Sequence, residues 1–90
     1  MGIRMNAGYI ITDSIHVENV EFVIGVDSTA PSQFVTWECK DGNNYYWGHY
    51  MDDGLSAVKD LLERAGRELE FQLRRRESAN KTKGDKERER

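Results

Sequence analysis

Alternation of apolar and polar residues in the first half of the chain constrains the fold more than any other feature. Residues 9–26 hold two runs rich in β-branched side chains that alternate with a period of two, as expected for antiparallel strands with one buried face. A two-residue turn at 18–19 pairs Val17 with Val20 and collects the apolar side chains on one face. Asp13 interrupts that face, so we expect a β-bulge near Asp13 and Ser14.

Residues 33–51 predict a second hairpin, because the Asp-Gly step at 41–42 is a strong turn signal between two alternating runs. Closing the turn at this step pairs Trp37 with Tyr46. Gly48 then lies beside Trp37, where its missing side chain leaves room for the indole.

The same parity divides the side chains of this hairpin between two faces. One predicted face holds Val35, Trp37, Cys39, Tyr46, Gly48 and Tyr50. The opposite face holds Phe34, Thr36, Glu38, Lys40, Tyr45, Trp47 and His49. A single helix covers only one face of a sheet. We expect it to cover the first face and to leave the second open.

An amphipathic helix is predicted to follow the sheet, capped by Asp52 or Asp53 and ending near Arg76. Its apolar side chains recur every three or four residues and form one stripe. The stripe consists of Leu55, Val58, Leu62, Ala65, Leu69 and Leu73. Gly66 costs the helix about 1 kcal/mol relative to alanine, and we expect it to let the helix lie close to the sheet.

These elements predict an α+β fold, in which an antiparallel sheet of about four strands in two hairpins packs on one C-terminal helix. Residues 8–76 are expected to form the single domain. Residues 1–7 are expected to be an N-terminal extension, and residues 1–4 are left out of the fold prediction because Met5 is a second candidate start. Residues 77–90 are almost free of apolar side chains, so we expect a charged, disordered tail.

Composition excludes several classes of protein. No apolar run approaches the roughly 20 residues of a membrane-spanning helix. The single cysteine, Cys39, excludes an internal disulfide and favours a reducing compartment, so we expect a cytoplasmic protein. The two histidines and Cys39 have no zinc-site spacing, and we expect no metal and no cofactor. His49 and Cys39 lie on opposite predicted faces and no catalytic motif is present, so we expect no enzyme.

The predicted open face suggests a docking surface for a protein. Aromatic side chains on a solvent-facing sheet are typical of contacts with a partner. The candidate protein-binding residues are Phe34, Tyr45, Trp47, His49 and Glu38. The alternative interpretation is that cross-strand aromatic pairs only stabilise a small sheet.

Charge is distributed unevenly, although the net charge is only −3. Residues 1–73 carry twelve acidic and five basic side chains, whereas residues 74–90 carry eight basic and four acidic ones. An acidic body suits a basic partner surface, and its carboxylates suggest a mimic of nucleic acid. The basic tail suggests instead an accessory protein that binds nucleic acid. The candidate residues for that alternative are Arg74, Arg75, Arg76, Lys81 and Lys83.

The second hairpin and the helix that follows it carry a family resemblance. The segments 34–39 (FVTWEC), 43–50 (NNYYWGHY) and 57–61 (AVKDL) resemble small proteins of unknown activity that are carried by mobile genetic elements of gut Firmicutes. The resemblance extends from about Gly8 to Gln72. It implies an accessory role in a conjugative element, plasmid or phage, where anti-CRISPR and anti-restriction inhibitors also occur, and it implies no particular site residue.

Three functions remain open at this point. The preferred hypothesis is a non-enzymatic protein-binding module that acts on a nucleic-acid-processing or defence enzyme of the host. The first alternative is the nucleic-acid-binding accessory protein. The second is a homodimeric structural module in which the open sheet face pairs with itself. None of the three requires a membrane.

Overall fold

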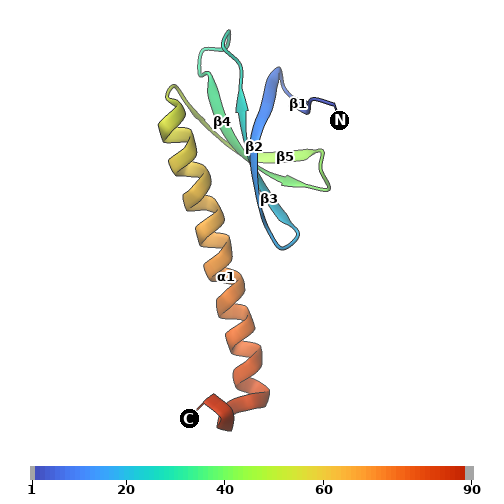
Figure 1. Ribbon diagram of the computed structural model, residues 1–90, viewed down its shortest axis with the longest axis vertical. Helices are drawn as coiled ribbons and strands as arrows, with labels where there is room; N and C mark the ends of the chain where they lie inside the picture. The colour runs from blue at the N-terminus through green and yellow to red at the C-terminus, as the bar shows by residue number, and fades with distance from the viewer. Residues whose placement is uncertain (1, 89–90) are drawn as a thin grey trace.

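The structure, a computed structural model, describes the backbone of residues 2–88 and the side chains of residues 2–77. Five antiparallel strands follow one another in the sheet in chain order, and one long helix lies against the sheet (Figure 1). The elements are β1 (Met5–Asn6), β2 (Tyr9–Val17), β3 (Val20–Val26), β4 (Phe34–Lys40), β5 (Asn44–Met51) and α1 (Gly54–Arg88). The predicted α+β class is confirmed, with five strands rather than about four.

The hairpin of β2 and β3 has the predicted register. Val17 pairs with Val20, and the bulge lies between Ile11 and Asp13, one position before the expected one. The bulge shifts the parity of β2, so Ile11 packs on one face of the sheet while Val17 packs on the other. In the turn, Glu18 has a positive φ of 58°.

The N-terminal segment belongs to the sheet, which corrects the expectation of an extension over residues 1–7. Met5 pairs with Ile10 and Asn6 with Tyr9. The turn between β1 and β2 is made by Ala7 and Gly8, both with positive φ. Two paired residues are too short a strand to show the period-two pattern on which the sequence prediction depends.

The hairpin of β4 and β5 differs from its predicted register in two places. Its loop contains three residues, because Lys40 pairs with Asn44, and this extra residue exchanges the faces of Tyr45 and Tyr46. A bulge then restores the expected parity, because two residues of β5, Trp47 and Gly48, lie opposite Trp37 alone. Gly48 does leave room for that indole, since a methyl group in its place would lie 2.9 Å from Trp37 Nε1.

The helix covers the face of the sheet that we expected to be open. Phe34 packs with Ala57 and Leu61 of α1, and His49 contacts Asp60 of α1. The reason lies in β3, which has its most apolar face on this side. Paired residues in an antiparallel sheet share a face, and Phe22 of β3 pairs with Glu38 rather than with Trp37.

The opposite face of the sheet has a second core, made by its own aromatic side chains. Trp37 lies at its centre and is buried together with Tyr9, Val23, Val35 and Cys39. The sheet curls around this indole, so the rings of Tyr9 and Tyr50 come within 6.1 Å of each other although β3 and β4 lie between their strands. Ring contacts therefore bury most of the face that has no helix.

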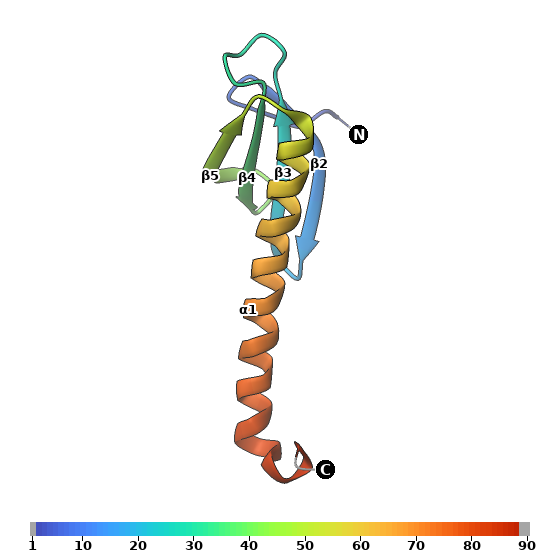
Figure 2. The same ribbon diagram turned by 90° about the vertical axis from the view of Figure 1, so that its left-hand side faces the viewer.

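The helix begins where the sequence predicts and continues beyond the expected end. Asp53 caps it, because its carboxylate accepts a hydrogen bond of 2.9 Å from the amide of Ser56. We expected the helix to end near Arg76, but it continues to Arg88, because its charged residues are good helix formers and no proline stops it. Figures 1 and 2 show its C-terminal half projecting beyond the sheet. Among the described residues, no helix is long and apolar enough to cross a membrane.

Candidate functional site

The bulge in β5 displays an indole at the surface. Trp47 has a left-handed backbone, with φ at 60°, and 70% of its surface is exposed to solvent. A bulky residue rarely adopts this conformation, which costs roughly 1–2 kcal/mol in an L-residue. Its only aromatic neighbour among the described contacts is Tyr46, with ring centroids 6.3 Å apart. The fold therefore gains little from an indole that it holds in a strained position.

Trp47 lies at a shallow hollow of about 360 Å³ between the sheet and the helix. The hollow is lined by Phe22, Glu38, Trp47, His49, Arg64, Arg67 and Glu68. Exposed apolar surface is supplied by Trp47, because Phe22 is buried and the guanidinium of Arg64 lies above its ring at 5.9 Å. Charges of both signs surround this apolar surface. We call these seven residues the Trp47 patch.

A hydrogen-bonded network holds the floor of the Trp47 patch. Arg64, which is buried, donates to the carbonyl oxygen of Thr36 at 3.0 Å and to its hydroxyl at 2.9 Å. The hydroxyl of Thr36 in turn donates to the carboxylate of Asp60. His49 Nδ1 lies 2.9 Å from the same carboxylate. These contacts join β4, β5 and α1. They hold the three elements that carry the side chains at the rim of the patch in fixed positions.

The electrostatics of this network favour an ionised Asp60. Burial opposes ionisation of its carboxyl, but the hydrogen bonds to Thr36 and His49 outweigh burial and hold the pKa below its ordinary value. Burial lowers the pKa of Arg64 from its ordinary value, but a guanidinium remains charged in proteins. The base of the patch is therefore a compensated pair of charges.

The five predicted protein-binding residues divide into two groups. Trp47, His49 and Glu38 come together in the Trp47 patch. Phe34 instead packs in the core beneath the helix, and Tyr45 packs on Trp37 on the opposite face, with ring centroids 5.6 Å apart. The shift of register at the three-residue loop accounts for Tyr45, and the position of the helix accounts for Phe34.

The candidate nucleic-acid residues lie on the projecting part of α1. Arg74, Arg75 and Arg76 are exposed, yet Arg75 lies over the ring of Phe71 at 5.5 Å and Arg76 approaches Glu18 at 3.8 Å. The side chains of Lys81 and Lys83 lie outside the part of the chain that the structure describes. Arg75 and Arg76 also line a hollow whose other members include Glu18 and Glu68, so carboxylates accompany these two arginines.

The sequence prediction missed a cluster built on Arg4. Its guanidinium donates to both carboxylate oxygens of Glu21, at 2.9 and 3.2 Å, and to the Tyr45 hydroxyl at 3.2 Å. Cys39 Sγ lies 3.4 Å from the same guanidinium. The hydrogen bonds from Arg4 hold the pKa of the buried Glu21 below its ordinary value. The signal in the sequence is Glu21 itself, because a carboxylate buried within a strand such as β3 needs a basic partner.

Two carboxylates of the acidic body, Glu21 and Asp60, therefore point into internal contacts, which leaves fewer of its carboxylates free to mimic nucleic acid. The pair of His49 and Cys39 is divided between the two faces as predicted, because His49 contacts the helix and Cys39 the aromatic core. Among the described residues, no three His, Cys, Asp or Glu side chains gather in a way that could hold a metal ion.

Comparison with known proteins identified no relative of this chain. No protein-family model matches the chain, and it matches none of the curated proteins or solved structures with which it was compared.

Proposed function

We propose that the protein is a non-enzymatic binding module that docks on a partner protein through the Trp47 patch. The observation that carries the proposal is the exposed indole on a left-handed bulge. Strained backbone conformations persist where the surrounding fold maintains them, and they are enriched at functional sites. Tryptophan is also among the residues that contribute most to protein interfaces.

The surroundings of the indole support a docking role. Interfaces commonly have an apolar centre surrounded by polar side chains that exclude water. In the Trp47 patch, Glu38, His49, Arg67 and Glu68 line the same hollow as the exposed indole of Trp47. The network of Thr36, Asp60 and Arg64 fixes the base beforehand, which lowers the entropic cost of binding.

Charge indicates the kind of partner. The excess of acidic side chains in residues 1–73 attracts a basic protein surface and repels a phosphate backbone. Enzymes that process nucleic acid carry such basic surfaces, because their substrates are polyanions. We therefore propose a host nucleic-acid-processing or defence enzyme as the partner, and a cytoplasmic site of action. This role fits an accessory protein of a mobile genetic element, including an anti-CRISPR-like inhibitor.

The test compares two forms of the protein immobilised on a resin. Trp47→Gly removes the indole and places at this position the residue best suited to a positive φ, so this variant should fold with stability equal to or about 1 kcal/mol above that of the wild type. Lysate of a gut Firmicute is passed over both resins in moderate salt. We expect a nucleic-acid-processing enzyme that the wild type retains and Trp47→Gly loses.

Ile10→Ser serves as the matched control, because it removes an exposed apolar side chain of β2 that is not part of the Trp47 patch. It should retain the partner as the wild type does. Retention of no protein by the wild type would overturn the proposal. Equal retention by the wild type and Trp47→Gly would overturn the assignment of binding to the Trp47 patch.

A further inference from the structure

The helix has a second apolar surface that the sheet does not cover. Ala57, Leu61 and Ala65 face the sheet core, whereas Leu62 and Leu69 are 56% and 48% exposed. Most of the exposed apolar side chains of the helix lie on one side of it: Leu55, Val58, Leu62, Leu69 and Leu73. We call these five residues the outer stripe; the exposed Phe71 lies on another side. A contiguous apolar patch of this kind on a small protein indicates an interface.

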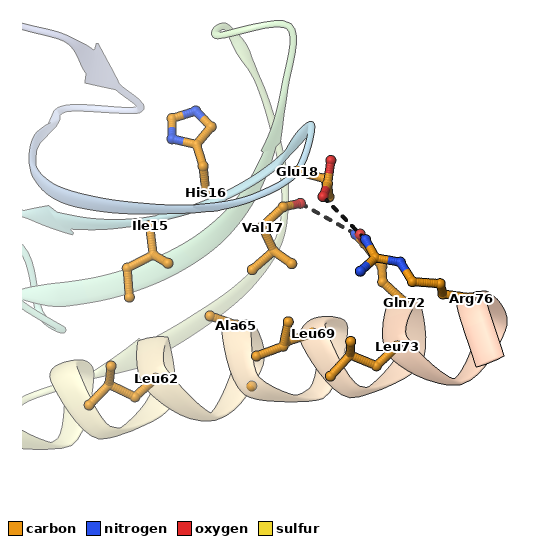
Figure 3. A pocket seen from close by; sticks show the side chains of 11 residues that line it. Ile15, His16, Val17, Glu18, Leu62, Ala65, Leu69, Gln72, Leu73 and Arg76 are labelled. Carbon is orange, nitrogen blue, oxygen red and sulfur yellow. Dashed lines mark hydrogen bonds and ion pairs between the residues drawn. The ribbon is translucent and has the colours of Figure 1, made fainter. Parts of the chain in front are cut away.

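Three residues of the outer stripe, Leu62, Leu69 and Leu73, line one wall of a groove of about 580 Å³ between α1 and the end of β2. Figure 3 shows Leu62, Leu69 and Leu73 along the helix, with Ile15 and Val17 of β2 above them. The far end is closed by Gln72, which donates to the carbonyl oxygen of Val17 at 3.3 Å. The groove is open to solvent and shares no lining residue with the Trp47 patch. The two surfaces are therefore distinct.

We propose that a second copy of this chain covers the outer stripe, with the two α1 helices packed antiparallel about a two-fold axis. The stripe has the symmetry that such an interface requires. Val58 and Leu73 lie equally far from the step between Ala65 and Gly66, as do Leu62 and Leu69. With a two-fold axis at that step, Leu62 of one copy packs against Leu69 of the other, and Val58 packs against Leu73. Because the contact is isologous, each of these pairs occurs twice in the dimer.

Gly66 occupies the centre of this arrangement and has no role within the chain. A methyl group in its place would meet no atom within 4 Å. This corrects the expectation that Gly66 lets the helix approach the sheet. Glycine inside a helix costs about 1 kcal/mol relative to alanine, so the chain bears this cost without an internal benefit. A small residue at the crossing point lets a second helix approach closely.

The exposed charges along the helix favour the antiparallel arrangement. Asp52 and Asp53 precede the outer stripe, and Arg74, Arg75 and Arg76 end it. With the axis at residues 65–66, the arginines of one copy lie within about one turn of the aspartates of the other. A parallel pair would place arginines beside arginines, and like charges in such positions destabilise a helix pair.

Cysteine crosslinking in the full chain tests both the contact and its direction. In the antiparallel dimer, Gly66→Cys lies at the axis and should form a disulfide between copies on oxidation. Val58→Cys should not, because its two copies lie about 22 Å apart along the helix at 1.5 Å per residue, beyond the reach of a disulfide. Mixing Val58→Cys with Leu73→Cys should yield the crosslinked heterodimer. The native Cys39 is buried, so the wild type is the unreacted control.

Solution mass tests the stripe independently of crosslinking. The wild type should have twice the mass of one chain at high micromolar concentration, and Leu69→Glu should have the mass of one chain. Phe71→Glu is the matched control, because Phe71 is also 48% exposed but lies on another side of the helix, so this variant should stay dimeric. A monomeric wild type, a crosslink in Val58→Cys alone, or dissociation by Phe71→Glu would each overturn the proposal.

Discussion

At the scale of single residues, Arg4 lies before the alternating runs that predict the strands, yet it neutralises a charge buried within the sheet. Glu21 points into the aromatic side of the sheet and is almost fully buried, where an unpaired carboxylate would be strongly destabilising. Arg4 meets it with two hydrogen bonds and also packs over the ring of Tyr45 at 5.6 Å. The pairing of β1 with β2 delivers Arg4 to this position.

Replacing Arg4 should therefore change how stability depends on pH. The pKa of Glu21 in the folded protein is below its ordinary value, so its contribution is present above the unfolded pKa and is lost as pH falls through the folded pKa. We expect Arg4→Met to cost on the order of 2 kcal/mol at pH 7, because the guanidinium is partly exposed, and clearly less near pH 3.

Urea unfolding of the wild type and Arg4→Met at both pH values measures this difference. Adding Glu21→Gln to Arg4→Met removes the buried charge and should restore part of the loss at neutral pH. A difference between wild type and Arg4→Met that stays constant from pH 7 to pH 3 would show that the ion pair contributes nothing to stability.

At the scale of elements, the attachment of the helix to the sheet depends on few contacts. Apolar packing involves only Ala57, Leu61 and Ala65 on the helix side, all within its first twelve residues. The hydrogen bonds of Asp60 and Arg64 with Thr36 fix the position of the helix along the sheet. Removing a member of such a network leaves buried polar groups without partners, which costs more than the bond itself contributes.

We therefore expect Asp60→Ala to lower the free energy of unfolding by about 2–4 kcal/mol, because it removes the carboxylate that accepts from Thr36 and that compensates most of the charge of the buried Arg64. Glu63→Ala is the control on the same helix, since Glu63 pairs only with the exposed Lys59. Its effect should stay below about 0.5 kcal/mol. Chemical denaturation of both variants gives the comparison, and equal effects would mean that Asp60 does not fasten the helix.

The same elements show what the sequence could and could not predict. The register of Val17 with Val20 follows from alternation, and the start of the helix follows from the preference of aspartate for caps. The covered face depends on how β3 pairs with β4, a contact across a long loop that no local pattern encodes. Trp47 was identified as a candidate from its residue type, but the bulge that displays it is set by packing around Trp37 and Gly48.

At the scale of the whole molecule, β3 joins two cores that lie on opposite faces of one sheet. Val23 packs in the aromatic core around Trp37, and its neighbours Phe22 and Ile24 pack beneath the helix. A strand buried on both faces cannot lose one set of contacts without weakening the other. The two cores should therefore unfold together, as small domains generally do.

Trp47→Gly makes this cooperativity measurable, because it leaves Trp37 as the only tryptophan of the two in the chain. Trp37 fluorescence then reports on the aromatic core, and far-ultraviolet circular dichroism reports mainly on α1. In urea, at a fixed protein concentration, both signals should change at the same midpoint. Adding Val23→Ala, which opens a cavity on the aromatic side only, should lower both midpoints equally. A helix signal that is lost first, or that ignores Val23→Ala, would show that the helix is a separable layer.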